Sequence, residues 1–216
     1  MFKKVLLAVV VSVMSVFSYS YTCFPPLAEE GKFAINPVLF MDDNNSGGME
    51  TFFYYGLMEN MDISTSILTT ADGYAGFSTM LRYAIGQPVI GLKLNPSLAI
   101  PQLSYDWEDD LFILQSTVAS QIVYDYSDKP AFYGTVSPGY KFSEIVNLCV
   151  DLSPGYYMQD GDFANYAVRN KGFGFDIAPS LGFAVGDCLF SVAVPIYNVQ
   201  KDAKVTFGAW FYYTVK

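Results

Sequence analysis

A two-residue alternation of apolar with small or polar side chains recurs in stretches along the chain after residue 31 and limits which folds it can adopt. The last segment shows the pattern most clearly, with Val205, Phe207, Ala209, Phe211, Tyr213 and Val215 on one face and Thr206, Gly208, Trp210, Tyr212 and Thr214 on the other. Successive side chains of a β-strand point to opposite faces, so this period is typical of a strand. Sustained helical periodicity is missing from the sequence, which predicts an all-β fold.

Twelve segments of this kind follow one another, and most are separated by residues that favour turns. We expect strands near 32–41, 49–58, 61–69, 74–85, 89–99, 101–107, 111–124, 131–142, 146–157, 172–185, 188–198 and 204–215. The segment 101–107 is counted separately because the outward phase is even-numbered in 90–100 and odd-numbered from Leu103 onward. The prediction is a single antiparallel barrel of about twelve strands, with ten as the alternative.

Six segments place an aromatic side chain in the outward phase just before a short turn. These side chains are Tyr55, Tyr83, Trp107, Phe142, Phe183 and Tyr213. An aromatic residue repeated at one depth is typical of the girdle where a membrane-spanning barrel meets lipid headgroups. We therefore expect a transmembrane barrel of the bacterial outer membrane. Short periplasmic turns are expected at 59–60, 86–88, 143–145 and 186–187, and longer outside loops at 42–48 and 158–171.

The N-terminal twenty residues have the pattern of a secretory signal peptide. Lys3 and Lys4 precede an apolar core, and Ser18 and Ser20 suit the positions before a cleavage site. We expect a signal peptide at 1–20, a periplasmic leader at 21–31 and the barrel domain at 32–216. A membrane anchor is less favoured because about 13 apolar residues are short for a bilayer. Lipid attachment at Cys23 stays open as a minor alternative, since the preceding residues fit the usual motif poorly.

Charge and residue content exclude several classes of function. Removing Lys3 and Lys4 from the 12 basic residues leaves ten against 21 acidic ones, a mature net charge of −11, which argues against nucleic-acid partners. The chain has no histidine, which removes Ser-His-Asp and Cys-His catalytic arrangements and imidazole zinc sites, so we expect no enzyme, no cofactor and no metal site. The loop from Asp42 resembles the start of a calcium loop, but Phe53 stands where the twelfth-position Glu is needed.

Inward-phase residues predict a polar barrel interior. The charged members are Glu50, Arg82, Lys93, Lys141, Asp151 and Asp176. A charged side chain that faced hydrocarbon would be costly, so charges in the inward phase are consistent with a hydrated lumen. The alternative is that these charges form ion pairs that close the barrel. Small inward residues between Gly174 and Ala184 and between Asn147 and Gly155 would leave space there. Five Pro-centred repeats, at 35–39, 94–98, 136–140, 152–156 and 177–181, predict regular bends in the strands.

Short motifs resemble those of a known family. The turn from Tyr55 to Ile63, Tyr-Gly-Leu-Met-Glu-Asn-Met-Asp-Ile, resembles the aromatic-Gly-Leu-Thr-Asp-x-Leu-Asp-Leu turns of bacterial outer-membrane transporter and porin-like barrels, and the Ser-Pro-Gly-Tyr strands resemble theirs as well. The resemblance implies an outer-membrane channel-like barrel and names no substrate. The chain departs from that family at its end, since Tyr213-Thr-Val-Lys216 lacks the terminal aromatic residue.

The favoured function is a porin-like channel for passive diffusion of small polar solutes, with a weak preference for cations from acidic loops at Asp42, Asp43, Asp160 and Asp162. Its partners would be membrane lipid and small solutes or ions, and the sequence does not indicate an oligomeric state. The alternative is a closed structural or adhesive barrel that acts through its outside loops, chiefly 158–171. A third possibility is a soluble β-sandwich or lipocalin-like carrier.

Overall fold

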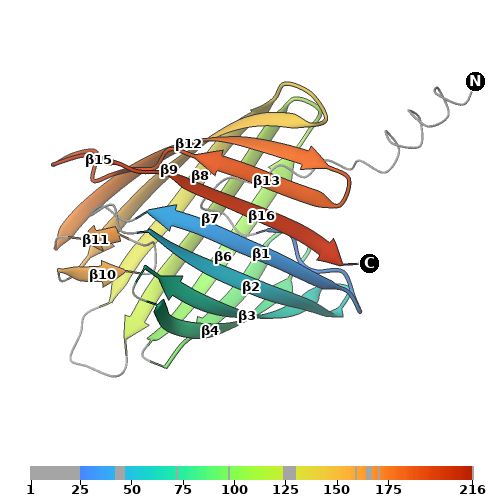
Figure 1. Cartoon of the computed structure of the whole chain (residues 1–216), viewed down its shortest axis with the longest axis horizontal. Helices are drawn as coiled ribbons and strands as arrows, with labels where there is room; N and C mark the ends of the chain where they lie inside the picture. The colour runs from blue at the N-terminus through green and yellow to red at the C-terminus, as the bar shows by residue number, and fades with distance from the viewer. Residues whose placement is uncertain are drawn as a thin grey trace, which may run out of the picture.

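The chain forms one closed antiparallel β-sheet (Figure 1), which confirms the predicted barrel of twelve strands. The computed structural model describes residues 25–41, 47–71, 73–96, 98–123, 130–158, 160–163, 167–169 and 171–215. Its strands are β1 (Phe33–Met41), β2 (Gly47–Met58), β3 (Met61–Thr70), β4 (Gly73–Ala84), β5 (Val89–Leu94), β6 (Leu98–Glu108), β7 (Phe112–Val123), β8 (Ala131–Lys141), β9 (Val146–Tyr157), β10 (Gly161–Phe163), β11 (Ala167–Arg169), β12 (Gly172–Val185), β13 (Cys188–Ala193), β14 (Ile196–Tyr197), β15 (Lys204–Val205) and β16 (Gly208–Val215).

Backbone pairing closes the sheet into a ring. Each strand from β1 to β8 pairs with the next, β9 pairs with β12, β12 with β13, β13 with β16, and β16 with β1. Two of the expected strands, 188–198 and 204–215, are each interrupted. The first is divided into β13 and β14 at Pro195, which has no N–H to donate to a ladder. The Pro195 carbonyl instead accepts a 2.8 Å hydrogen bond from the Thr206 N–H, at the matching break between β15 and β16.

The predicted division between residues 99 and 101 was in the wrong place, although the strand count was right. The chain turns between Leu94 and Leu98, so Ile100 belongs to β6 and is buried in the inward phase instead of facing outward. Asn95 makes this turn, since its Oδ1 accepts the Leu98 N–H at 2.8 Å and its own N–H donates to the Leu98 carbonyl at 3.0 Å. The change of phase noted in the sequence is the result of this turn.

The two ends of the barrel differ in the length of their connections. One end is called the short-turn end, and its described connections are 59–60, 85–88, 109–111, 142–145 and 186–187. Strand β1 begins at this end and β16 finishes there. At the other, the loop end, the hairpin β10–β11 lies within the loop expected at 158–171, and the β14–β15 extension projects (Figure 1). Within the described residues, no helix is long and apolar enough to cross a membrane.

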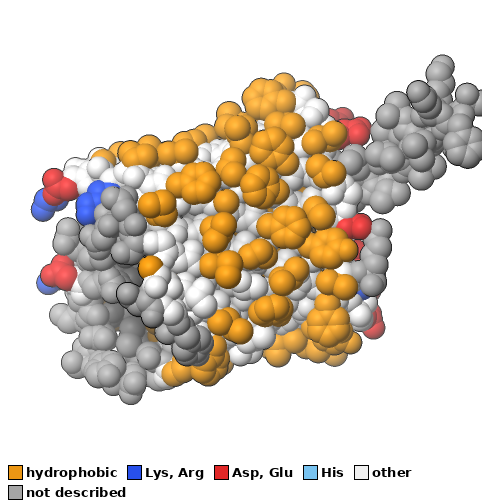
Figure 2. Space-filling view, viewed as in Figure 1, with side chains coloured by type: hydrophobic (Ala, Val, Ile, Leu, Met, Phe, Trp, Pro, Cys, Tyr) orange, Lys and Arg blue, Asp and Glu red, His pale blue; other side chains and the backbone are white. Residues whose placement is uncertain are grey.

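Outward side chains are apolar and inward ones are largely polar or small. On β7, Leu114, Val118 and Ile122 are exposed, whereas Gln115 and Thr117 are buried. In the described parts of β1–β9, β12, β13 and β16, every charged side chain stands in the inward phase. Figure 2 shows the apolar side chains over the middle of the visible face, with charged groups toward its two ends. This is the surface of a barrel that spans a membrane, and it does not fit a soluble β-sandwich or carrier.

The Pro-centred repeats do not all lie in strands. Pro96 stands in the turn between β5 and β6, whereas the other four repeats lie inside β1, β8, β9 and β12. In β1 the lost donor is replaced locally. The register of β1 on β16 places Pro37 opposite Phe211, and the Phe211 carbonyl accepts a 2.7 Å hydrogen bond from Asn36 Nδ2. The side chain before this proline therefore supplies the N–H that proline lacks.

Candidate functional site in the barrel interior

Glu50 and Lys93, two of the six predicted lumen-facing charges, form an ion pair inside the barrel. Lys93 Nζ lies 2.8 Å from Glu50 Oε1, and Ser66 Oγ donates to the same oxygen at 2.6 Å. The Lys93 ammonium also stands 5.0 Å from the centre of the Phe52 ring. Because β2, β3 and β5 supply these groups, the pair ties together strands that are not all neighbours in the sheet.

Arg82 pairs with Asp62, a residue that the sequence reasoning missed. The two face each other across β3 and β4, with Arg82 Nε 3.0 Å from Asp62 Oδ1 and Nη2 2.5 Å from Oδ2. Arg82 is 2% exposed and Asp62 is fully buried. The alternation around Ile63, Thr65 and Ile67 could have placed Asp62 in the inward phase.

Lys141 lies near the short-turn end and pairs with Glu108, which was also missed. Lys141 Nζ contacts Glu108 Oε1 and donates to the Asp109 carbonyl. Asp109 shapes the turn between β6 and β7, since its carboxylate accepts the N–H groups of Leu111 and Phe112. The Phe112 and Leu111 N–H groups lower the pKa of Asp109, so this turn carboxylate stays ionised at neutral pH.

Asp151 and Asp176 each accept a hydrogen bond from a neutral donor. Ser137 Oγ donates to Asp151 Oδ1 at 2.6 Å, and the Asn198 N–H donates to Asp176 Oδ1 at 2.8 Å. Asp151 also belongs to a line of inward residues that face one another across β6, β7, β8 and β9. This polar row consists of Asp106, Gln115, Ser137 and Asp151.

Large side chains occupy one part of the interior and small ones another. A buried cluster is formed by Ala28, Ala34, Phe52, Tyr54, Met80, Trp210 and Tyr212, which come mostly from β1, β2, β4 and β16. The wall of small residues on β9 and β12 was expected to leave space, but Cys149, Ala178, Ser180 and Ala184 are all buried. Within this wall the Asn147 side chain lies against Gly182 and the Tyr157 ring against Gly155. Cys149 and Cys188 are not joined by a disulfide, and Cys23 lies outside the described residues.

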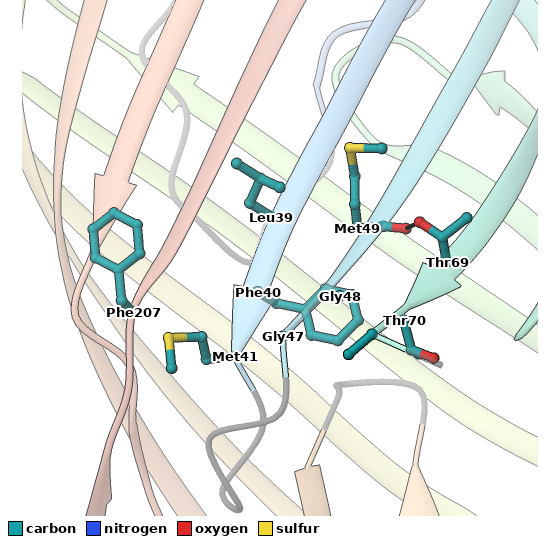
Figure 3. A pocket seen from close by; sticks show the side chains of 10 residues that line it. Leu39, Phe40, Met41, Gly47, Gly48, Met49, Thr69, Thr70 and Phe207 are labelled. Atoms are coloured by element: carbon teal, nitrogen blue, oxygen red, sulfur yellow. Dashed lines mark hydrogen bonds between the residues drawn. The ribbon is translucent and has the colours of Figure 1, made fainter. Parts of the chain in front are cut away.

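An apolar groove of about 420 Å³ opens at the loop end, lined by the ends of β1, β2 and β3 together with Phe207 (Figure 3). The Phe40 ring lies across Gly48, where a Cβ would stand 2.4 Å from the ring tip. Glycine at position 48 therefore allows Phe40 to turn into the barrel. Residues 42–46, whose resemblance to a calcium loop the sequence argues against, lie outside the described residues.

The predicted aromatic girdle residues all stand on the outer surface near the short-turn end. Tyr83, Trp107 and Phe142 are exposed, with Phe142 in the turn after β8, and the remaining three are half-buried. A second outward row, Phe132, Tyr156 and Phe173, lies near the loop end on β8, β9 and β12 and was missed. Phe132 and Tyr140 are eight residues apart on β8, about 20 Å along the barrel axis for a tilted strand. That height is close to the apolar band of about 25 Å in outer-membrane barrels.

The fold is shared with solved bacterial porins and channels. The NanC porin and the KdgM porin each align with a TM-score of 0.61 and 11% identity over 85% of this chain and 99% of theirs. An outer-membrane channel from Pseudomonas putida F1 aligns with a TM-score of 0.59 and 9% identity over 93% of this chain and all of that one. No family model and no curated protein sequence matches the chain. The closed barrel, its apolar outer belt and this shared fold together indicate an outer-membrane barrel of porin-like architecture.

Proposed function

We propose that the protein is an outer-membrane, porin-like channel for passive diffusion of small polar solutes. The observation that carries this proposal is the partition of charge across the barrel wall. Nine charged side chains of the described barrel strands stand in the inward phase: Glu50, Asp62, Asp106, Glu108, Asp151, Asp176, Arg82, Lys93 and Lys141. A barrel that only had to sit in lipid could fill its interior with apolar side chains at lower desolvation cost.

The excess of acidic over basic side chains among these nine inward-phase residues favours a weak preference for cations. Six of these nine side chains are acidic, and three are basic. Fixed negative charge in a low-dielectric wall concentrates cations. Asp106, the exposed member of the polar row, would supply carboxylate oxygen to a passing cation.

The solutes should be small. A twelve-strand barrel has a backbone radius of roughly 12 Å, and inward side chains take up much of that width. The aromatic cluster around Phe52 and Trp210 occupies the β1, β2 and β16 side, which leaves the opposite side, where Asp106 of the polar row is exposed, as the more polar wall. Passage of ions and small polar molecules suits this interior better than passage of bulky ones.

The test is ion conduction by the purified protein in planar bilayers under a salt gradient. We expect a measurable conductance and a reversal potential of the sign that cations produce. The variant Asp106→Asn/Asp151→Asn should reduce that potential, whereas Glu144→Gln, at an exposed turn residue, should leave it unchanged. A reversal potential of the opposite sign in the wild type would rule out the cation preference, and absence of conductance would rule out the channel.

One observation favours a second function, a closed structural or adhesive barrel acting through its outside loops. Ser137, Cys149 and Asp151 have no exposed surface in the described interior. A barrel filled to this extent would block passive flow as it stands. Protease-accessible loops that bind a surface ligand, in a protein that does not conduct, would establish this alternative.

A further inference from the structure

The segment from residue 25 to residue 31 lies inside the short-turn end of the barrel. It precedes β1 and rests against the inward faces of β2, β3 and β4. Pro25 is buried, and Ala28 is 2% exposed and packs in the cluster that contains Tyr54 and Tyr212. We call residues 25–31 the inner segment.

Arg82 and Asp62 hold the inner segment by its backbone. Arg82 Nη1 donates to the Pro25 carbonyl at 2.6 Å, and Nη2 donates to the Pro26 carbonyl at 3.0 Å. Asp62 Oδ2 accepts the Ala28 N–H at 2.9 Å. The Arg82 guanidinium thus makes four hydrogen bonds, two to Asp62 and two to the carbonyls of the inner segment. Both members of the buried ion pair therefore also bind the segment.

Gly56 provides the second attachment. Its carbonyl accepts the Gly31 N–H at 2.9 Å, and its own N–H donates to the Lys32 carbonyl at 3.1 Å. A Cβ at position 56 would stand 2.0 Å from the Glu29 carbonyl oxygen and 2.6 Å from that of Ala28. These are rigid backbone atoms, so only glycine permits the approach.

The prolines make the segment suitable for this place. Pro25 fixes its own backbone, and the residue before a proline is kept extended, so the carbonyls of Pro25 and Pro26 are presented with little loss of entropy. Proline also prevents the segment from adding to the sheet as a further strand. It can therefore occupy the interior without becoming part of the wall.

We propose that the inner segment is a gate of the barrel, latched by the Arg82–Asp62 pair and by the close approach at Gly56. The inference rests on the proposed channel function. With the segment in place, the short-turn end is narrowed by a stretch of backbone and by buried Ala28. When the segment leaves, Arg82 and Asp62 remain paired with each other and line a wider opening.

The decisive variant is Gly56→Ala, which displaces the segment and leaves both latch side chains intact. Its matched control is Gly76→Ala, since Gly76 is an inward-phase glycine of β4 and a Cβ there meets nothing within 4 Å. Each variant carries Ala28→Cys in a chain whose three cysteines are replaced by serine, and each is purified from outer membranes of the expressing host. Heat-modifiable gel mobility verifies that each barrel is folded.

Two measurements separate the gate from the channel. Maleimide labelling of the thiol at position 28 should be about tenfold faster with Gly56→Ala than with Gly76→Ala, because the buried site opens. Single-channel conductance should rise about twofold with Gly56→Ala alone. Unchanged labelling would overturn the latch, and faster labelling with unchanged conductance of a conducting protein would overturn the gate. If no variant conducts, the channel function fails and the gate with it, whereas the labelling result still reports where the segment is held.

Discussion

Replacing Val118 by arginine tests whether the outer surface is solvated by lipid. Val118 stands in the outward phase near the middle of β7 (Phe112–Val123) and is 64% exposed. An arginine at the bilayer midplane of a membrane barrel costs about 2–4 kcal/mol, and the cost falls to about 0–1 kcal/mol near the interface. Since 1.4 kcal/mol is a factor of ten, the folding equilibrium should shift by roughly a hundredfold.

The matched control is Leu111→Arg, in the turn at the short-turn end, where Leu111 is 50% exposed. Both substitutions introduce the same side chain at an exposed apolar position, so the difference between their unfolding free energies reports the effect of depth in the bilayer. Equilibrium unfolding by guanidinium in lipid vesicles, followed by tryptophan fluorescence, gives the two free energies of unfolding. Equal costs for Val118→Arg and Leu111→Arg, both below about 1 kcal/mol, would refute the lipid assignment of this surface.

Two further predictions concern buried polar contacts, and the same unfolding assay measures both. Asn36→Ala should cost about 1 kcal/mol because the Phe211 carbonyl loses its donor. That cost should shrink in the presence of Pro37→Ala, which restores a backbone N–H; an equal cost in both backgrounds would show that Asn36 does not compensate for the proline. Arg82→Gln should destabilise by about 3–5 kcal/mol because Asp62 is left buried without its cation, and Asp62→Asn in the same chain should recover part of the loss. No recovery would mean that Arg82 acts mainly through its contacts with the inner segment.

Which side chains face outward could be predicted from the sequence, because contact with lipid requires apolar residues at every second position of each strand. The phases of Leu81 and Tyr83 place Arg82 on the inward face with no knowledge of its neighbours. Strand count follows from the same rule, including the change of phase near residue 100. The boundary of β6 was misplaced because Leu98 and Ile100 are apolar, and an apolar side chain suits both lipid and a filled interior.

Partners inside the barrel could not be predicted, since a period of two fixes the face of a side chain but not the register between strands. Asp62 meets Arg82 because the register of β3 on β4 places the two residues directly opposite each other. The inner segment was harder still. It has no alternation, and its contacts are made by backbone atoms whose positions depend on the absence of a side chain at Gly56.

The way this barrel is held together indicates where its interior can change. Every neighbouring pair of barrel strands, including the closing pair of β16 and β1, is joined by a backbone ladder, so widening the wall would break many hydrogen bonds at once. The inner segment is joined to the wall by an isolated bridge at Gly56 and by the side chains of Arg82 and Asp62. Its release costs far fewer contacts than any change in the strands. A change in conductance should therefore arise from movement within a fixed wall, and substitutions at the latch should alter it more than substitutions in the ladders.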